Sequence, residues 1–390
     1  MQSTTTLLRF RVTHSADTSA SRRPAGEMLE WVRRYGTNSC SYVLLEGAKS
    51  YFISPRVDGF LAYQISAGVP VIGGDPVCAP EQAAALIEDF VAAMKQPPIG
   101  AYQVSPQMLP AFQRAGFGDV QIGKEAIFDL RRFTLSGGQM ELVRAATNKA
   151  RREGVVVCEH HPFAPGAESI NEELRAISHE WLRSKGEREM GFLLGSLGLE
   201  RASAKRYFIA RSSGSRSRIE GFIVCEPIYG RKGYYLDATR RRGDAVRGTM
   251  ELLTTEIFRL LADEGYEIAS MGLAPLAQLD DPDLARHPRL TRLMRFVFQQ
   301  VNGKYDFKSL FRYKAKYHPH AWERRYFCFS EQRLSLRMLY ATLRVRNALA
   351  LRGLGRQHRE IRGFQEKVKS WKHAASLVVG LLSVVLSSSS

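Results

Sequence analysis

The segment from Gly233 to Leu273 constrains the fold more than any other part of the sequence. It opens with a short apolar and aromatic run, Tyr234–Ala238, which is typical of a buried strand. A basic turn follows, and then a helical pattern from about residue 250 to 264 that ends at Gly265. A second apolar strand covers residues 267–273. This order predicts a βαβ-like unit that presents backbone N–H groups and arginine side chains to an anion.

A carboxylate interrupts the first of these strands at Asp237. A charge inside a strand is costly unless it has a partner or a chemical task. Arg240, three residues later, is the obvious candidate partner. Two interpretations stay open, because the two residues could form a buried structural ion pair or act together in a functional site.

The charge balance indicates a polyanionic partner. The chain has 56 Lys and Arg against 39 Asp and Glu, a formal net charge of +17. Such an excess favours nucleic acid or anionic lipid, although a merely soluble basic surface is the alternative. The five cysteines are scattered without a CxxC pair, so we expect neither a disulfide framework nor a metal site. We expect no cofactor.

The element pattern predicts an α+β fold. The second part of the chain repeats the order of the first, which indicates two tandem domains with mixed, mostly antiparallel sheets. Strands are expected at residues 42–45 and 50–53 and in a hairpin over 59–72, among others. The expected regions are a disordered N-terminus (1–26), a first domain (27–135), a second, catalytic domain (136–332) and a basic amphipathic tail with a short apolar end (333–390).

Two further segments are rich in basic residues. Residues 141–153 form a predicted basic helix that carries Arg151 and Arg152. Residues 305–326 interleave Lys and Arg with aromatic side chains, a pattern that suits phosphate contact and base stacking. The alternative is an amphipathic element that packs its aromatic side chains inward and leaves its charges in water.

The tail combines charge with an apolar stripe. Leu334, Met338, Ala341, Val345 and Ala348 recur at helical spacing, and the short apolar stretch 374–386 follows. A basic amphipathic helix before an apolar end suits an anionic membrane surface. A solvated basic tail is the alternative interpretation.

The sequence lacks the familiar motifs of covalent, metal and nucleotide chemistry. GxSxG, HExxH, Walker A and dinucleotide-binding patterns are all absent. What remains is a set of charged residues near strands and turns: Glu187, Glu189, Asp237, Arg240, Arg247 and residues 312–316. Such groups suit a group-transfer site that works by positioning and electrostatics.

Several runs of residues match those of a known protein family. The most telling is Leu310-Phe-Arg-Tyr-Lys-Ala-Lys-Tyr-His-Pro319, which is followed by Trp322-Glu-Arg-Arg-Tyr326. Others are Val71-Ile-Gly-Gly-Asp-Pro-Val77, Asn148-Lys-Ala-Arg-Arg-Glu-Gly154, Lys185-Gly-Glu-Arg-Glu-Met-Gly-Phe192 and Asn302-Gly-Lys-Tyr-Asp-Phe307. These runs resemble the C-terminal catalytic domain of bacterial phosphatidylglycerol lysyl- and alanyltransferases, and the matches keep their order from about residue 28 to 330.

The resemblance implies a tandem acetyltransferase-like (GNAT) fold and transfer of an aminoacyl group from aminoacyl-tRNA to a lipid hydroxyl. Asp237 and Arg240 match the family's Asp-x-x-Arg on the central strand, and Lys314 and Lys316 match its Tyr-Lys-x-Lys. Glu187 or Glu189 matches its acidic residue before Gly-Phe. We therefore expect Asp237, Arg240, Glu187, Lys314 and Lys316 to be catalytic. The expected substrate-binding residues are Glu189, Arg247, Arg312, Tyr313, Arg151 and Arg152.

The leading hypothesis is a stand-alone transferase of lysyl or alanyl groups. Its donor would be aminoacyl-tRNA and its acceptor phosphatidylglycerol, and it would bind peripherally to the inner face of the cell membrane. Another lipid or amine acceptor is one alternative. A non-catalytic protein that binds tRNA or membrane is another. The resemblance leaves the oligomeric state and the transferred amino acid open.

Overall fold

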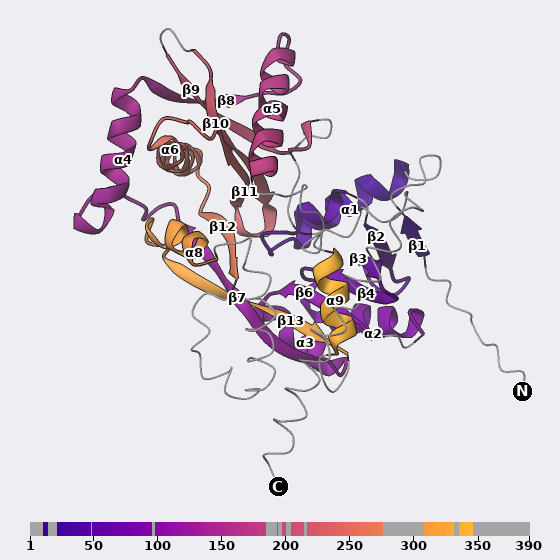
Figure 1. Cartoon of the computed structure of the whole chain (residues 1–390). Helices are drawn as coiled ribbons and strands as arrows, with labels where there is room; N and C mark the ends of the chain where they lie inside the picture. Colours follow the sequence, from indigo (N-terminus) through magenta and orange to yellow (C-terminus); the bar gives the residue numbers. More distant parts are fainter. Residues whose placement is uncertain are drawn as a thin grey trace, which may run out of the picture. The chain divides into compact units, whose positions relative to one another are not determined.

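The computed structural model describes residues 11–14, 22–47, 49–95, 98–184, 193, 197–199, 204–213, 217–275, 307–330 and 335–345. All of them lie in the first of the two units into which the chain divides, Met1–Ala348. Within these ranges the strands form one 13-stranded, mixed sheet (Figure 1). No helix among the described residues is long and apolar enough to cross a membrane.

The first half of the sheet comes from the N-terminal part of the chain. Its strands are β1 (Arg11–His14), β2 (Ser50–Ile53), β3 (Gly59–Ser66), β4 (Val69–Gly73), β5 (Val77–Cys78), β6 (Gly100–Val104) and β7 (Gly118–Asp129). Its helices are α1 (Arg22–Tyr35), α2 (Ala83–Ala93) and α3 (Leu109–Arg114), with short 3₁₀ turns η1 (Val43–Leu45), η2 (Pro80–Gln82) and η3 (Pro106–Met108).

The second half follows the same plan. Its strands are β8 (Val155–His160), β9 (Arg206–Ser212), β10 (Ile219–Ile228), β11 (Gly233–Arg241), β12 (Ile268–Pro275) and β13 (Ala321–Phe329). Its helices are α4 (Glu141–Arg152), α5 (Glu168–Ser184), α6 (Thr249–Asp263) and α8 (Phe307–Ala315), and α9 (Leu336–Val345) comes after it. The 3₁₀ turns are η4 (Gly138–Met140) and η6 (Tyr229–Arg231).

The strand order contains an internal repeat. Strands β2, β3 and β4 are antiparallel neighbours, and β4 is parallel to β6; strands β9, β10 and β11 repeat this, with β11 parallel to β12. The tandem α+β fold with a mostly antiparallel sheet is therefore confirmed. The predicted βαβ-like unit is also confirmed, because α6 connects the parallel strands β11 and β12.

The two halves exchange their last strands. The order across the centre of the sheet is β6-β13-β7-β12, so β13 lies between the two final strands of the first half. In the same way β7 lies between the two final strands of the second half. The exchange joins the halves by antiparallel pairing along β7 and β13, from Ala321 opposite Ile127 to Phe329 opposite Gly118.

Helices cover both faces of the second half (Figure 1). On one face, Leu174 and Ile177 of α5 pack against Phe222 and Val224 of β10. On the other face, α4 and α6 form a core with β9–β12 in which Phe258 is fully buried. Because both faces are covered, every residue of β10 is buried, including Glu220 and Glu226.

Helix α9 packs onto the first half. It contacts β3, β4 and β6, and its side chains Met338, Ala341 and Val345 are buried. The described part of the apolar stripe, which suited a membrane surface, is thus buried against the protein itself. Residues 346–390, with the apolar stretch 374–386, lie outside the described residues.

Two expectations near the N-terminus differ from the structure. The predicted strand at residues 42–45 is wrong, because Val43–Leu45 is a 3₁₀ turn. Three apolar residues without alternation do not determine a period, and buried packing decides their conformation. Within the segment expected to be disordered, the structure describes β1, which pairs with β2, and the start of α1 at Arg22.

Candidate functional site

The candidate site lies where the parallel strands β11 and β12 diverge. They pair only from Gly233 opposite Ile268 to Tyr235 opposite Ser270. Just beyond, each strand has a bulge: Asp237 and Ala238 lie opposite Val224, and Met271 and Gly272 lie opposite Ala126. Gly272 adopts φ +73°, a conformation that glycine tolerates without strain. Bulges redirect side chains and are frequent beside active sites.

Asp237 lies at this divergence and is half-buried. Its Oδ2 atom is buried and has no hydrogen-bond partner among the described residues. Burial raises the pKa of Asp237 to about 6, although the charge of Lys205 and a hydrogen bond from Tyr235 favour the ionised form. A carboxyl group with such a pKa can gain or lose charge near neutral pH.

Arg240 is buried and positioned by α5. Its guanidinium donates to the Ser178 hydroxyl and lies 5.8 Å from the centre of the Trp181 ring. Its charge also favours ionised Asp237, but less than the charge of Lys205 does. Reasoning from the sequence missed the larger effect of Lys205 on Asp237, because the two residues are 32 positions apart.

Lys314, in α8, and Lys316, just after the end of α8, have different partners in the structure. Lys314 is buried, and its Nζ atom donates to the carbonyls of Gly272 at 2.9 Å and Leu273 at 2.8 Å. Burial lowers the pKa of Lys314 to about 7, while Glu125 and Asp237 favour its protonated form. Lys314 therefore faces the β12 bulge and interacts with Asp237.

Lys316 points to a different partner. Its Nζ atom forms an ion pair with Glu251 of α6 and lies 4.2 Å from the centre of the Tyr313 ring. Tyr313 in turn lies edge-on to Tyr317, with ring centroids 5.7 Å apart. Lys316 and Tyr313 are thus occupied in packing α8 against α6.

The remaining predicted residues are spread over the surface or lie outside the described chain. Arg247 and Arg312 are exposed. Arg151 and Arg152 are exposed too, and Arg151 forms an ion pair with Glu256. Glu187 and Glu189 lie outside the described residues. The site that the structure brings together therefore contains Asp237 and Lys314, with Arg240 held beside it by α5.

The turn before α6 was expected to hold an anion, and a protein carboxylate already binds part of it. Glu220 is buried and accepts the backbone N–H of Val246 at 3.1 Å. Gly248, at the start of α6, adopts φ +95°, and a Cβ atom there would lie 2.0 Å from the Ala146 carbonyl oxygen. Close packing against α4 thus requires glycine at this position.

Sequence reasoning missed a set of buried charges around the site. Lys205, Glu226, Glu125 and Arg325 are all buried, and Arg325 lies 2.5 Å from Glu125. Glu226 and Glu125 interrupt apolar strands in the same way as Asp237. That signal could have identified them. Among the described residues no group of three or more His, Cys, Asp or Glu side chains could hold a metal ion.

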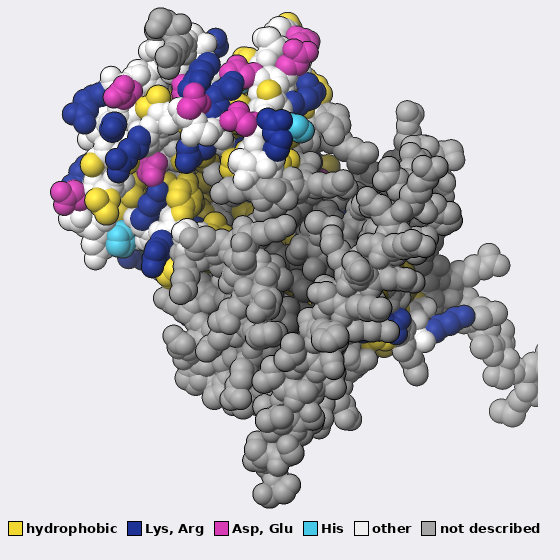
Figure 2. All heavy atoms as spheres, viewed as in Figure 1, with side chains coloured by type: hydrophobic (Ala, Val, Ile, Leu, Met, Phe, Trp, Pro, Cys, Tyr) yellow, Lys and Arg dark blue, Asp and Glu magenta, His cyan; other side chains and the backbone are white. Residues whose placement is uncertain are grey.

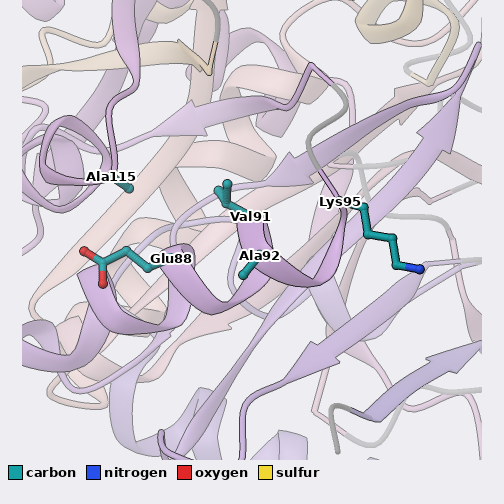
Figure 3. Close-up of a pocket in the computed structure, with 5 residues that line it drawn as sticks. All are labelled: Glu88, Val91, Ala92, Lys95 and Ala115. Atoms are coloured by element: carbon teal, nitrogen blue, oxygen red, sulfur yellow. The ribbon is translucent and has the colours of Figure 1, made fainter. Parts of the chain in front are cut away.

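A separate groove of about 490 Å³ lies on the first half. Figure 3 shows its lining: Glu88, Val91, Ala92 and Lys95 extend from α2 and its C-terminal end, and Ala115 follows α3. It contains none of the predicted site residues.

Comparison with known proteins gives consistent results. The family profile described as "Phosphatidylglycerol lysyltransferase, C-terminal" matches residues 30–329. A phosphatidylglycerol lysyltransferase of Bacillus subtilis is 29% identical over 82% of this chain, which spans 37% of that relative. A lysylphosphatidylglycerol biosynthesis bifunctional protein of Gordonia bronchialis is 28% identical over 88% of this chain and 30% of its own length. The chain thus spans about a third of these relatives.

A solved structure is also similar. The structure of L-PGS from Bacillus licheniformis has a TM-score of 0.69 to this chain and 26% sequence identity. The similarity covers 82% of this chain and 95% of that one.

Proposed function

The chain belongs to the family of phosphatidylglycerol lysyltransferase C-terminal domains, and from this premise we propose that it transfers a lysyl or alanyl group from aminoacyl-tRNA to phosphatidylglycerol. The observation that carries the proposal is that Asp237 and Lys314 both lie at the divergence of β11 and β12, where the charge of Asp237 favours protonated Lys314. One is a carboxylate with a buried, unpartnered oxygen, and the other is a buried ammonium held at a bulge.

The reaction exchanges one ester for another. The lipid hydroxyl oxygen attacks the carbonyl carbon of the aminoacyl ester, and negative charge develops on the carbonyl oxygen. The bond from that carbon to the tRNA ribose oxygen then breaks, and the proton of the lipid hydroxyl ends on the ribose oxygen. Catalysis therefore requires a cation near the carbonyl oxygen and an anion for the aminoacyl ammonium group.

Lys314 supplies the cation in this proposal. An ammonium group has three N–H donors, and the carbonyls of Gly272 and Leu273 bind two of them. We assign the third to the oxyanion of the transition state. Lys316 is the weaker candidate, because its charge already has Glu251 and two tyrosine rings as partners.

Asp237 supplies the anion. Its buried Oδ2 atom would accept the α-ammonium group of the aminoacyl moiety, which fixes the ester against Lys314. Arg240, held by Ser178 and near Trp181, would orient Asp237 or bind a phosphate of the tRNA end or lipid head group. Glu187 or Glu189 would add to the binding of the ammonium group.

Basic surface residues would bind the tRNA backbone. Figure 2 shows Lys and Arg side chains over α4, with Asp and Glu side chains among them. The exposed Arg152 on α4, together with Arg247 and Arg312, would contact phosphates, with Arg151 as a further contributor. Affinity should then fall steeply with salt, because counterions are released on binding.

We further propose that the protein acts at the cytoplasmic face of the membrane and that residues 349–390 promote membrane binding. Deleting them leaves α9 and its buried side chains in place. The truncated protein should sediment less with phosphatidylglycerol vesicles in low salt. Unchanged sedimentation would contradict the proposed role of this segment.

The function is tested by incubating the purified chain with lysyl- or alanyl-tRNA and phosphatidylglycerol vesicles. We expect a new ninhydrin-positive lipid whose mass identifies the amino acid and the acceptor, and none with the Asp237→Asn variant. A product on another lipid or an amine would identify a different acceptor. No product while tRNA still binds would instead indicate a non-catalytic binding protein.

A further inference from the structure

Lys205 is a buried cation that forms ion pairs with a carboxylate from each half of the protein. It lies at the start of β9, and its Nζ atom is 2.6 Å from Glu46 Oε1 and 3.1 Å from Glu226 Oε1. Glu226 is on β10 in the second half, whereas Glu46 directly follows η1 in the first half. Burying three charges together is favourable only when they are well paired. Glu226 and Glu46 outweigh the effect of burial and raise the pKa of Lys205, so it stays charged.

The segment that carries Glu46 is itself anchored. Lys49 is buried, and its Nζ atom donates to the carbonyl of Val43 at 2.8 Å and to the carbonyl of Glu46. The Tyr51 hydroxyl donates to the Leu44 carbonyl at 2.9 Å. The position of Glu46, and through it the position of Lys205, is therefore determined by the first half.

The cluster reaches the proposed site through neighbouring strands. Glu226 lies opposite Tyr235 in the pairing of β10 with β11. Tyr235 hydrogen-bonds to Asp237 two residues later, where the bulge begins. Lys205 is also the cation that contributes most to the ionised form of Asp237.

We propose that Lys205 is a positioning residue for aminoacyl transfer, whose buried charge beside β11 keeps Asp237 ionised, and that Glu46, by fixing Lys205, makes the first half part of this site. The inference rests on the proposed function of Asp237. Lys205 does not touch the substrate in this proposal.

The electrostatic surroundings of Asp237 make the inference testable by pH. The charged or titratable groups that bear on Asp237 are Lys205, Glu226, Tyr235, Arg240, Glu46 and Lys314. Cys225 is also near, and burial raises the pKa of its thiol and keeps it neutral. Lys205 lowers the pKa of Asp237, whereas Glu46 raises it. Neutralising these two partners should thus have opposite effects.

The experiment measures transfer against pH for Lys205→Met and Glu46→Gln, with lysyl- or alanyl-tRNA and phosphatidylglycerol vesicles. Asp237 must be ionised, so activity rises as pH increases through its pKa. This rise is the acid limb of the pH profile. In Lys205→Met the acid limb should lie about one pH unit higher than in the wild type, so transfer near pH 5 should be about tenfold slower than in the wild type. The ratio to wild type should return toward one at higher pH. Glu46→Gln should move the limb downward.

Two controls separate this effect from loss of packing. Lys205→Arg keeps the charge and should restore the wild-type limb. Arg131→Gln removes a cation from an exposed ion pair with Asp129 and should not move the limb. If Lys205→Met does not fold, Glu46→Gln and Lys205→Arg decide the matter, with their melting temperatures measured alongside. Loosening that let water reach Asp237 would also lower its pKa, but it would lower the melting temperature as well.

An unmoved limb in a folded Lys205→Met variant, or the same direction of shift in both variants, would overturn the inference. Asp237→Asn is measured alongside. If that variant is active, the proposed role of Asp237 fails. If it is inactive while the limb does not move, only the role of Lys205 fails.

Discussion

The two halves of the sheet open at the same place but hold different groups there. In the first half the parallel pair β4–β6 ends with Gly73 opposite Tyr102, and in the second half β11–β12 ends with Tyr235 opposite Ser270. Two residues beyond these positions lie Asp75 and Asp237, each with a buried Oδ2 atom that lacks a hydrogen-bond partner among the described residues. The carboxylates thus occupy corresponding positions.

Their surroundings differ. Asp75 accepts the backbone N–H of Ser105 at 2.8 Å, and the neutral amide of Asn38 donates to the carbonyl of Gln103 at the β6 bulge. At the β12 bulge the donor is instead the ammonium of Lys314. The carbonyl at the bulge is therefore bound by a neutral amide in the first half and by an ammonium group in the second. In the proposed mechanism only the second of the two similar openings carries the chemistry.

The largest expected effect separates the two aspartates. Asp237→Asn should remain folded and bind tRNA but lose about 10²–10³-fold in transfer rate, since it no longer binds the ammonium group as an anion. Asp75→Asn should keep most activity, because an amide oxygen still accepts from Ser105. Melting curves and single-turnover rates check both. Wild-type rates in Asp237→Asn would remove it from the site.

The next prediction separates the lysines. Lys314→Met should reduce transfer by about 10²–10³-fold, because the oxyanion loses its cation. Lys316→Met should keep the rate and lose only about 1 kcal/mol of stability, since it breaks a partly buried ion pair and a contact with Tyr313. Transfer assays and chemical denaturation measure the two effects. Equal loss of rate in both variants would contradict the assignment to Lys314.

The pH dependence of transfer should reflect the ionisation of both Asp237 and Lys314. Asp237, with a pKa of about 6, must be ionised, so activity falls as pH decreases through that value. Lys314, with a pKa of about 7, must be protonated, so activity falls as pH increases through that value. A bell-shaped profile results, whose two limbs belong to the coupled pair. Asp75→Asn should leave the profile unchanged, and a flat profile in the wild type would refute the pairing.

The smallest effect concerns tRNA affinity. Arg152→Ala should weaken binding. It should also reduce the slope of log affinity against log salt concentration by the amount expected for about one phosphate contact. Arg151→Ala should do less, because Arg151 is paired with Glu256. Arg114, an exposed arginine of the first half, is the matched control. Filter binding at several salt concentrations tests this, and an effect of Arg114→Ala equal to that of Arg152→Ala would place tRNA elsewhere.

The strands and the helix around the candidate site could be predicted from the sequence better than the side chains that form it. Tyr234–Ala238, the helix after it and the strand at 267–273 were recognisable because each keeps one period and ends at a turn. The choice between Lys314 and Lys316 was not recognisable. Lys314 lies in the last turn of α8 and Lys316 just after its end, so only the packing shows which of them faces β12. Lys205 and Glu46 are distant in sequence from Asp237, so local patterns could not join them to it.

The exchange of β7 and β13 has a consequence for how the chain must fold. Gly100 in β6 pairs with Phe329 in β13, more than two hundred residues later. Contacts so distant in sequence form slowly, because a long loop must close before they stabilise the structure. During synthesis the first half lacks its inner strand until β13 has left the ribosome, and β6 and β7 remain unpaired along their facing edges until then. The last strand of the sheet is therefore the one that completes both halves at once.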